Sequence, residues 1–255
     1  MKHTPARSTS WHGVKKWYNS LVGTDGHYYH KHIVLPGLLK LMNANKDSRV
    51  IDLGCGQGVL ARALPEVAQY WGLDIAPGLI AAAKSETKLD NYAFQVQDVT
   101  RPMPAIKAHF THAVFVLSLQ NMKDARTALT NAANALIPGG MLVIVLNHPC
   151  FRIPRQSGWN TDEKTKQQSR WINRYLSPQE IPITMNPGQR SSQVTWSFHH
   201  SLQDYTKMLT HHGLSITGLE EWASDKESQG KAARMENRSR AEIPLFLAIQ
   251  AKKSL

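Results

Sequence analysis

The stretch that decides the fold is VIDLGCGQGVL, Val50–Leu60, an apolar run that breaks into glycines at every second position. A strand, a glycine turn and a helix in this order bring free backbone N–H groups and a helix N-terminus to one point, which suits an anionic or polar ligand group. A nucleotide-triphosphate loop needs G-x-x-x-x-G-K-[ST], which is not present in this stretch. The dinucleotide pattern G-x-G-x-x-G also fails, because Val59 stands where the third glycine belongs.

Three aspartates near this loop point to another kind of cofactor. Asp52 precedes the first glycine, where it would repel a pyrophosphate but attract an ammonium group. Asp74 closes the next apolar stretch, roughly 20 residues past Gly54, where an acid can hold both hydroxyls of a ribose. Asp98 follows the third such stretch and could accept a hydrogen bond from an adenine amino group. These residues indicate an adenosine-bearing cofactor with a charged amine.

Apolar strands alternate with helical stretches from Arg49 to Asn147, which predicts a parallel sheet covered by helices on both faces. The predicted strands are 49–53, 70–75, 92–96, 109–119 and 141–147, and the predicted helices are 57–64, 77–84 and 124–136. Before them we predict a helix over 11–22 and a second over 33–42, which Pro36 kinks or restarts. After them we predict a helix capped by Ser201 and Asp204, strands at 214–222 and 243–251, and a charged loop at 223–241.

Four segments carry a resemblance to a known family: VIDLGCGQG, GLDIAPGLI, the QD of QVQDV, and LIPGGMLVIV. In order and spacing they resemble the class I S-adenosylmethionine-dependent methyltransferases, in particular the small-molecule branch of the ubiquinone-biosynthesis-like type (methyltransferase type 11). The resemblance spans about 49–147. It implies a Rossmann-like, doubly wound α/β fold whose seven-stranded sheet has its last strand antiparallel. It also implies S-adenosyl-L-methionine as the cofactor and S-adenosyl-L-homocysteine as the product.

The resemblance also implies which residues hold the cofactor. The glycine loop packs under the methionine part, Asp74 binds the ribose, Asp98 and Val99 address the adenine, and residues after the fourth strand line the sulfonium. The cofactor-binding residues are then Asp52, Gly54, Cys55, Gly56, Gly58, Asp74, Ile75, Asp98, Val99, Leu117, Ser118 and Gln120, with Tyr29 reaching over from the N-terminal segment. For Tyr29, packing between helices is an equally good interpretation.

We expect one methyltransferase domain over 1–255, made of a helical cover (1–46), a cofactor-binding core (47–147), a cap inserted after the fifth strand (148–200) and a C-terminal helix with strands (201–255). The cap is polar, rich in proline and long, which is typical of a functional lid. Most of the 7 tryptophans lie in the cover and the cap. We expect Trp17, Tyr18, Phe151 and Trp159 to shape a pocket for an apolar or flat acceptor. The alternative is that cap tryptophans form a small core of the cap itself.

Histidines are the readiest proton carriers near neutral pH. His148 follows the fifth strand, at the sheet edge where ligands bind in such folds, and His199 precedes the last helix, so both are candidate catalytic residues. The alternative for each is a histidine that only hydrogen-bonds the cap. Cys150 could be the cysteine nucleophile that carbon-5 methylation of cytosine needs, but its flanks, NHPCF, lack an acidic partner, and we interpret it as a small buried hydrophobic residue.

The net charge of +11 keeps nucleic acid among the candidate partners, although a solvated basic face on a small-molecule enzyme is the preferred interpretation. The segment SLQNM stands where base-amino methyltransferases carry D/N-P-P-Y/F/W, which argues against methylation of DNA amino groups. Three functions are therefore weighed: methylation of a small molecule, methylation of RNA or another polyanion, and cofactor binding without catalysis. The sequence leaves the oligomeric state open.

Composition bounds the location and the partners. No apolar run reaches the ~18–20 residues of a membrane span, and the first residues have no secretory signal pattern. The 2 cysteines fit a reducing compartment and are too few for a structural zinc site. We therefore expect a cytoplasmic protein with no membrane partner and no metal.

Overall fold

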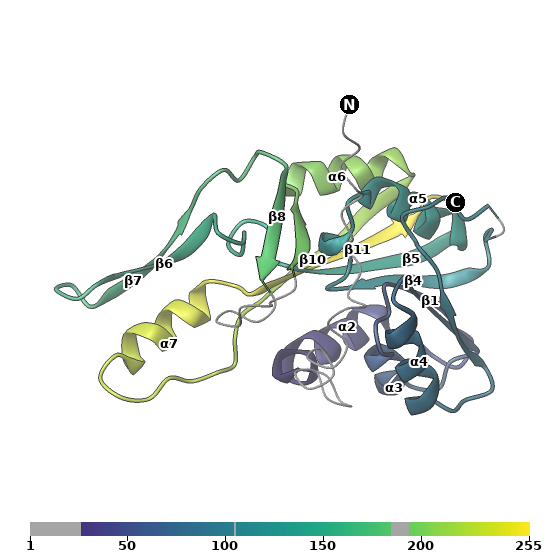
Figure 1. The fold of residues 1–255 in the computed structure, drawn as a ribbon, viewed down its shortest axis with the longest axis horizontal. Helices are drawn as coiled ribbons and strands as arrows, with labels where there is room; N and C mark the ends of the chain where they lie inside the picture. Colours follow the sequence, from purple (N-terminus) through teal and green to yellow (C-terminus); the bar gives the residue numbers. More distant parts are fainter. Residues whose placement is uncertain (1–26, 105, 185–193) are drawn as a thin grey trace.

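The computed structural model describes residues 27–104, 106–184 and 194–255. Its central feature is a seven-stranded sheet of order β10-β11-β5-β4-β1-β2-β3 (Figure 1). The strands are β1 (Arg49–Leu53), β2 (Gln69–Asp74), β3 (Tyr92–Val96), β4 (Phe110–Val116), β5 (Leu136–Asn147), β10 (Leu214–Trp222) and β11 (Phe246–Lys253). Strands β1 to β5 pair in parallel, whereas β11 is antiparallel to both β5 and β10. The predicted Rossmann-like sheet with its last strand antiparallel is confirmed.

Helices cover both faces of this sheet. One face carries α2 (Leu35–Met42), α3 (Val59–Ala63) and α4 (Pro77–Glu86), and the opposite face carries α5 (Ala125–Ala135) and α6 (Leu202–His211) (Figure 1). Along β5, Leu142 and Ile144 join the core beneath α5 and α6, while Val143 and Val145 join the core beneath α2 to α4. A central parallel strand has to be apolar on both sides, and the unbroken run MLVIVL meets that need.

The first described helical segment contains an irregular turn just before Pro36. Residues His30–Val34 form one turn of π-helix (η2), and α2 then begins at Leu35 with the proline in its first turn. Proline has no N–H to donate along the helix, and the wider turn η2, in which the Leu35 N–H bonds the His30 carbonyl, stands just before it. Pro36, predicted to kink or restart the helix, thus follows an irregular turn in a continuous helical segment, while the helix predicted over 11–22 lies outside the described residues.

The segment 148–200 contains two antiparallel hairpins that the sequence did not predict. One pairs β6 (Ser157–Asp162) with β7 (Gln167–Ile172), and the other pairs β8 (Gln179–Thr184) with β9 (Val194–His199). Strands β6 and β7 have no buried residue, so their sequences lack the apolar alternation that reveals a strand. The second hairpin packs against a 3₁₀ turn, η3 (Leu119–Asn121), which follows β4.

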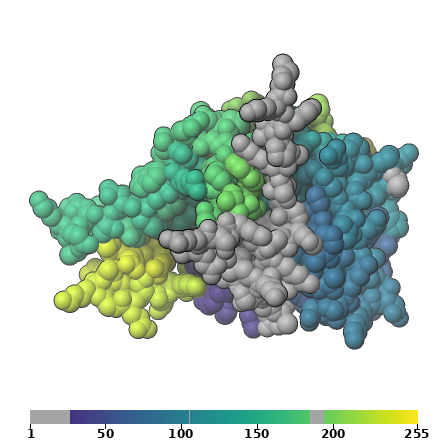
Figure 2. All heavy atoms as spheres, in the orientation of Figure 1, coloured from purple at the N-terminus to yellow at the C-terminus, as the bar shows by residue number. Residues whose placement is uncertain are grey.

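The prediction of a charged loop at 223–241 is wrong, because most of this segment's second half belongs to the helix α7 (Ala233–Glu242). Only Met235 and Ser239 of this helix are buried, so its sequence shows no apolar stripe. Helix α7 packs against β7, and its Ser239 hydroxyl donates a hydrogen bond to the Gln168 carbonyl (3.1 Å). Together α7 and the β6–β7 hairpin form an arm that extends from the core (Figures 1 and 2).

Candidate active site

The glycine loop turns sharply between β1 and α3. Gly54, Gly56 and Gly58 have φ angles of 84°, 55° and 77°, values that side-chain-bearing residues rarely adopt. The loop also lies against the end of β4, because a Cβ atom on Gly54 would be only 2.5 Å from the Cβ of Ser118. The backbone N–H of Gly54 donates to the Leu73 carbonyl (2.7 Å), which fixes the loop to the neighbouring strand β2.

Asp74, the last residue of β2, ties its strand to the glycine loop. Its Oδ2 accepts a hydrogen bond from the Gly56 N–H (2.9 Å), and its Oδ1 accepts one from the Ala76 N–H (2.8 Å). Burial raises the pKa of this carboxyl, while the two backbone N–H donors act against that rise. Each carboxylate oxygen keeps a second lone pair, so Asp74 can still accept hydrogen bonds from a ligand.

Asp98 stands just beyond β3 and is oriented by its own turn. Its Oδ1 accepts hydrogen bonds from the N–H (3.0 Å) and the hydroxyl (2.6 Å) of Thr100. Its Oδ2 lies 3.6 Å from the Nε of Arg101, at the protein surface. Two acids thus stand at the carboxyl ends of adjacent strands, where ligands bind in open parallel sheets.

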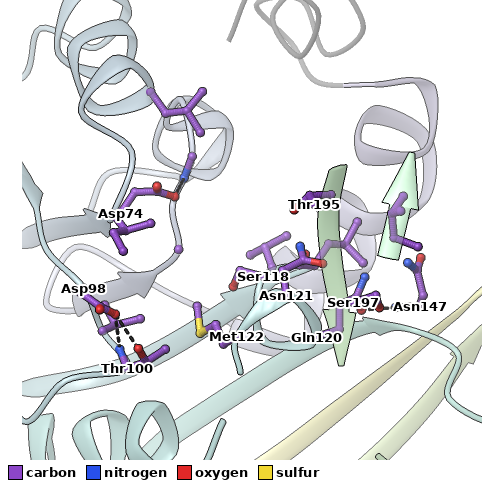
Figure 3. Close-up of a pocket in the computed structure, with 18 of the residues that line it drawn as sticks. Asp74, Asp98, Thr100, Ser118, Gln120, Asn121, Met122, Asn147, Thr195 and Ser197 are labelled. Atoms are coloured by element: carbon purple, nitrogen blue, oxygen red, sulfur yellow. Dashed lines mark hydrogen bonds between the residues drawn. The ribbon is translucent and has the colours of Figure 1, made fainter. Parts of the chain in front are cut away.

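Both acids line a cavity of about 440 Å³ (Figure 3). Its walls contain many of the residues that the sequence assigned to the cofactor: Gly54, Gly56, Asp74, Ile75, Asp98, Val99, Leu117, Ser118 and Gln120. Around them stand Leu79, Val116, Met122 and Ile183, which make much of the wall apolar. A cavity of this size, with polar groups at fixed positions in a largely apolar wall, is typical of a small-molecule site.

Four residues assigned to the cofactor lie outside the cavity wall. Asp52 is 1% exposed and accepts a hydrogen bond from the buried Tyr70 hydroxyl (2.7 Å), and burial raises its pKa to about 7. Asp52 thus makes its Oδ2 hydrogen bond in the core and does not line the described cavity, and its contact with an ammonium group stays a prediction. Cys55 is buried, and Gly58 starts α3 beside Phe94.

Tyr29 is the fourth such residue. Its hydroxyl lies 3.3 Å from the Ser224 hydroxyl, and its ring packs edge-on against Phe246 with 5.9 Å between ring centroids. This geometry fits the packing alternative for Tyr29. Its neighbour His30 lines the cavity instead.

The two candidate catalytic histidines are also held away from the cavity. His148 is 1% exposed, its Nε2 lies 2.7 Å from the Glu221 carboxylate, and its Nδ1 accepts the Cys150 N–H (3.2 Å). The Nε2 of His199 lies 2.7 Å from the Tyr175 carbonyl. Burial lowers the pKa of both rings. Neither ring lines the described cavity, and these bonds occupy both His148 nitrogens and hold the His199 ring, so the catalytic roles of the two histidines stay predictions.

The cap aromatics pack within the cap. Phe151 lies against the His148 ring, with 4.7 Å between centroids, and the guanidinium groups of Arg152 (5.5 Å) and Arg170 (5.2 Å) lie over the Trp159 ring. Neither Phe151 nor Trp159 is part of the described cavity wall, and their role in an acceptor pocket stays a prediction. Trp17 and Tyr18 lie outside the described residues. Burial raises the pKa of Cys150, which makes its thiol a poor nucleophile.

The cavity wall includes polar residues that the sequence did not assign. Thr195 and Ser197 come from β9, and Asn121 and Asn147 follow β4 and end β5. The Asn147 N–H donates to Oε1 of Gln120 (2.8 Å), which fixes both residues at one side of the cavity. The alternation T-x-S within VTWSFH was the available signal, but its meaning depended on finding a strand there.

Two further properties concern the described part of the chain. It holds no group of three or more His, Cys, Asp or Glu residues placed to bind a metal ion. Among the same residues, no helix combines the length and apolar character that crossing a bilayer demands.

Comparison with known proteins places this site in context. Residues 51–144 match the model of a family described as "Methyltransferase domain". The chain is similar to the trans-aconitate 2-methyltransferase of Methylobacterium nodulans (35% identical, covering 43% of each chain). It is also similar to the ubiquinone biosynthesis O-methyltransferase of Xanthomonas campestris (29% identical, covering 38% of this chain and 42% of that protein). The matched part thus spans less than half of these curated relatives. A solved S-adenosylmethionine-dependent methyltransferase from Mesorhizobium loti shares the fold, with a TM-score of 0.69, 23% identity, and coverage of 91% of this chain and 100% of the other.

Proposed function

We propose that this chain, whose residues 51–144 form a methyltransferase domain on the fold of S-adenosylmethionine-dependent methyltransferases, transfers a methyl group from S-adenosylmethionine to a small-molecule acceptor. The observation that carries the proposal is the meeting of the glycine loop, Asp74 and Asp98 in one cavity at the carboxyl ends of the strands. The names of the two curated relatives, which refer to aconitate and to ubiquinone biosynthesis, support a small acceptor.

The residues present fit such a cofactor. In this proposal Asp74, which also holds the Gly56 N–H, accepts hydrogen bonds from two ribose hydroxyls, and Asp98 accepts one from an adenine amino group. Gly54 brings the loop close to Ser118, whose hydroxyl is committed to the Leu53 carbonyl (2.7 Å). The acids and the loop would therefore orient the adenosine and methionine parts.

The cofactor supplies an electrophilic methyl group on a sulfonium. The chain's contribution is alignment and exclusion of water, because an in-line displacement gains most from a fixed approach geometry. Val116, Leu117 and Met122 supply the apolar wall that excludes water. A base is needed only if the acceptor atom has to lose a proton, which then passes to that base or to solvent.

Titration calorimetry with S-adenosylhomocysteine tests cofactor binding, with Asp74→Asn as the variant and the exposed Asp90→Asn as its matched control. Loss of charge-assisted hydrogen bonds at Asp74 should weaken binding roughly 10- to 100-fold. Asp90→Asn should bind like the wild type. Because Asp74 also holds the glycine loop, thermal melting of both variants has to accompany the titration. Failure of the wild type to bind at millimolar concentration would overturn the proposal.

Transfer of labelled methyl groups from S-adenosylmethionine into a cell extract tests the acceptor. The extract is divided into small-molecule, RNA and protein fractions, each with a nuclease-treated control. Label among the small molecules is expected. Label that disappears on nuclease treatment would mean that a polyanion is the substrate, and cofactor binding without label in any fraction would mean that the chain does not catalyse transfer.

A further inference from the structure

The cavity has two ends of different chemistry (Figure 3). At the first end lie Asp74, Asp98 and Thr100, which the proposed function assigns to the adenosine part of the cofactor. At the other end, here called the cap-side end, lie Gln120, Asn147, Thr195 and Ser197. Ser118 and Met122 lie between the two ends.

At the cap-side end, no described residue of the cavity wall has a charged side chain. Among the described residues that line the cavity, the charged ones are Asp74 and Asp98, both at the first end, and none is a lysine or an arginine. This is notable in a chain with 30 lysines and arginines. The polar groups at the cap-side end are hydroxyls and amides, which bind neutral groups and cannot neutralise a carboxylate or a phosphate.

Thr195 supplies an unused hydrogen-bonding group at this end. The residue is 4% exposed, and its hydroxyl has no hydrogen-bond partner in the described part of the chain. Strand pairing with β8 holds its backbone, so its place on β9 is fixed. Buried polar groups in native proteins nearly always have partners, and one without a partner in a cavity wall points to a ligand that supplies it.

His30 shows the same property in the same wall. It lines the cavity, and its Nδ1 is buried without a hydrogen-bond partner among the described residues. Burial lowers the pKa of this ring to about 4, so it carries no charge near pH 7 and can accept a hydrogen bond. His30 therefore adds a second uncharged group that can accept a hydrogen bond from a ligand.

We propose that the cap-side end binds an electrically neutral acceptor through a hydroxyl or amide group that hydrogen-bonds Thr195. This inference rests on the proposed function and names its substrate class. It separates this chain from a site for a tricarboxylate such as the aconitate named for one relative, because the described wall offers no cation to a carboxylate.

The test uses the full chain saturated with S-adenosylhomocysteine. A panel of small alcohols, phenols and carboxamides, each paired with a carboxylate of the same shape, is titrated and followed by ligand-observed NMR. We expect neutral members to bind at least tenfold more tightly than their carboxylate pairs. Equal or tighter binding of the carboxylates would overturn the inference, as would the absence of any neutral binder.

Variants at Thr195 connect this preference to the residue. Thr195→Val removes the hydroxyl at nearly constant shape and should weaken the neutral binders about fivefold, the factor that corresponds to a net hydrogen bond of ~1 kcal/mol. Thr195→Ser keeps the hydroxyl and should retain binding. Thr161→Val, at an exposed site in β6, is the matched control. Unchanged affinity in Thr195→Val would contradict the proposal.

The proposed function and the neutral-acceptor inference fail on different measurements. Affinity for S-adenosylhomocysteine should be unchanged in the Thr195 variants, because the adenosine end is distant from Thr195 in the cavity (Figure 3). If the wild type does not bind S-adenosylhomocysteine, the proposed function fails. If it does bind but the carboxylates are preferred, only the assignment of a neutral acceptor fails.

Discussion

Gly54 stands where the glycine loop comes closest to the end of β4. Gly54→Ala would combine an unfavourable φ of 84° with a Cβ only 2.5 Å from that of Ser118. We expect the free energy of unfolding to fall by about 2–4 kcal/mol, from strain in the left-handed region and from overpacking. Urea denaturation measures this. Gly230→Ala is the matched control, because its φ is 87° but a Cβ there meets nothing within 4 Å. Equal losses in both variants would show that the contact with Ser118 has no energetic cost.

Asp52 should make stability depend on pH. Its pKa in the folded chain is raised to about 7, so between pH 4 and 7 the folded state holds a proton that the unfolded state has lost. This contribution to stability is therefore present at low pH and is lost as the pH rises towards 7. Asp52→Asn cannot ionise. Its unfolding free energy relative to the wild type should rise by up to ~1.4 kcal/mol per pH unit over this window.

Urea titrations of wild type and Asp52→Asn at several pH values provide the measurement. Asp90→Asn, at an exposed position, should follow the wild type in parallel. Parallel curves for Asp52→Asn as well would mean that the Asp52 carboxyl ionises in the folded chain as it does in water.

Helix α6 illustrates an element whose start the sequence already defines. Ser201 Oγ accepts the Asp204 N–H (3.2 Å), and the Asp204 carboxylate accepts the Ser201 N–H (3.1 Å), so the predicted capping box is confirmed. Ser201→Ala should lower the free energy of unfolding by ~1 kcal/mol. Ser85→Ala, at an exposed serine of α4, should leave it nearly unchanged. Chemical denaturation of the two variants measures this difference. An equally small loss of unfolding free energy in both would contradict a stabilising role for the Ser201 cap.

The elements that the sequence predicted are those whose signal is local. The glycine turn, the acids that end β2 and follow β3, and the apolar run of β5 each lie within a few residues, and they placed much of the cavity wall correctly. Hairpin β6–β7 and helix α7 were missed because few of their side chains are buried, so their sequences carry no apolar pattern. The contact of His148 with Glu221 could not be predicted, because the two residues are 73 positions apart in the sequence. Thr195 gained its position only from the pairing of β8 with β9.

At the scale of the whole molecule, a basic protein encloses a cavity whose described wall contains no lysine or arginine. Binding of S-adenosylhomocysteine should therefore change less than about threefold between about 50 and 500 mM KCl, whereas any RNA bound by the basic exterior should dissociate by orders of magnitude. Calorimetry and filter binding at matched salt concentrations compare the two. A steep loss of S-adenosylhomocysteine affinity with rising salt would mean that the basic surface residues contribute to binding in the cavity.

The place of β11 affects how this chain is made on the ribosome. Its residues, 246–253, follow every other strand in the described chain, yet β11 lies inside the sheet between β5 and β10. During synthesis, β5 exposes an unpaired edge, and β10 has no strand to join, until residues 246–253 emerge from the exit tunnel. A nascent chain that stalls before residue 246 therefore presents a long apolar edge, the kind of surface that chaperones shield from aggregation.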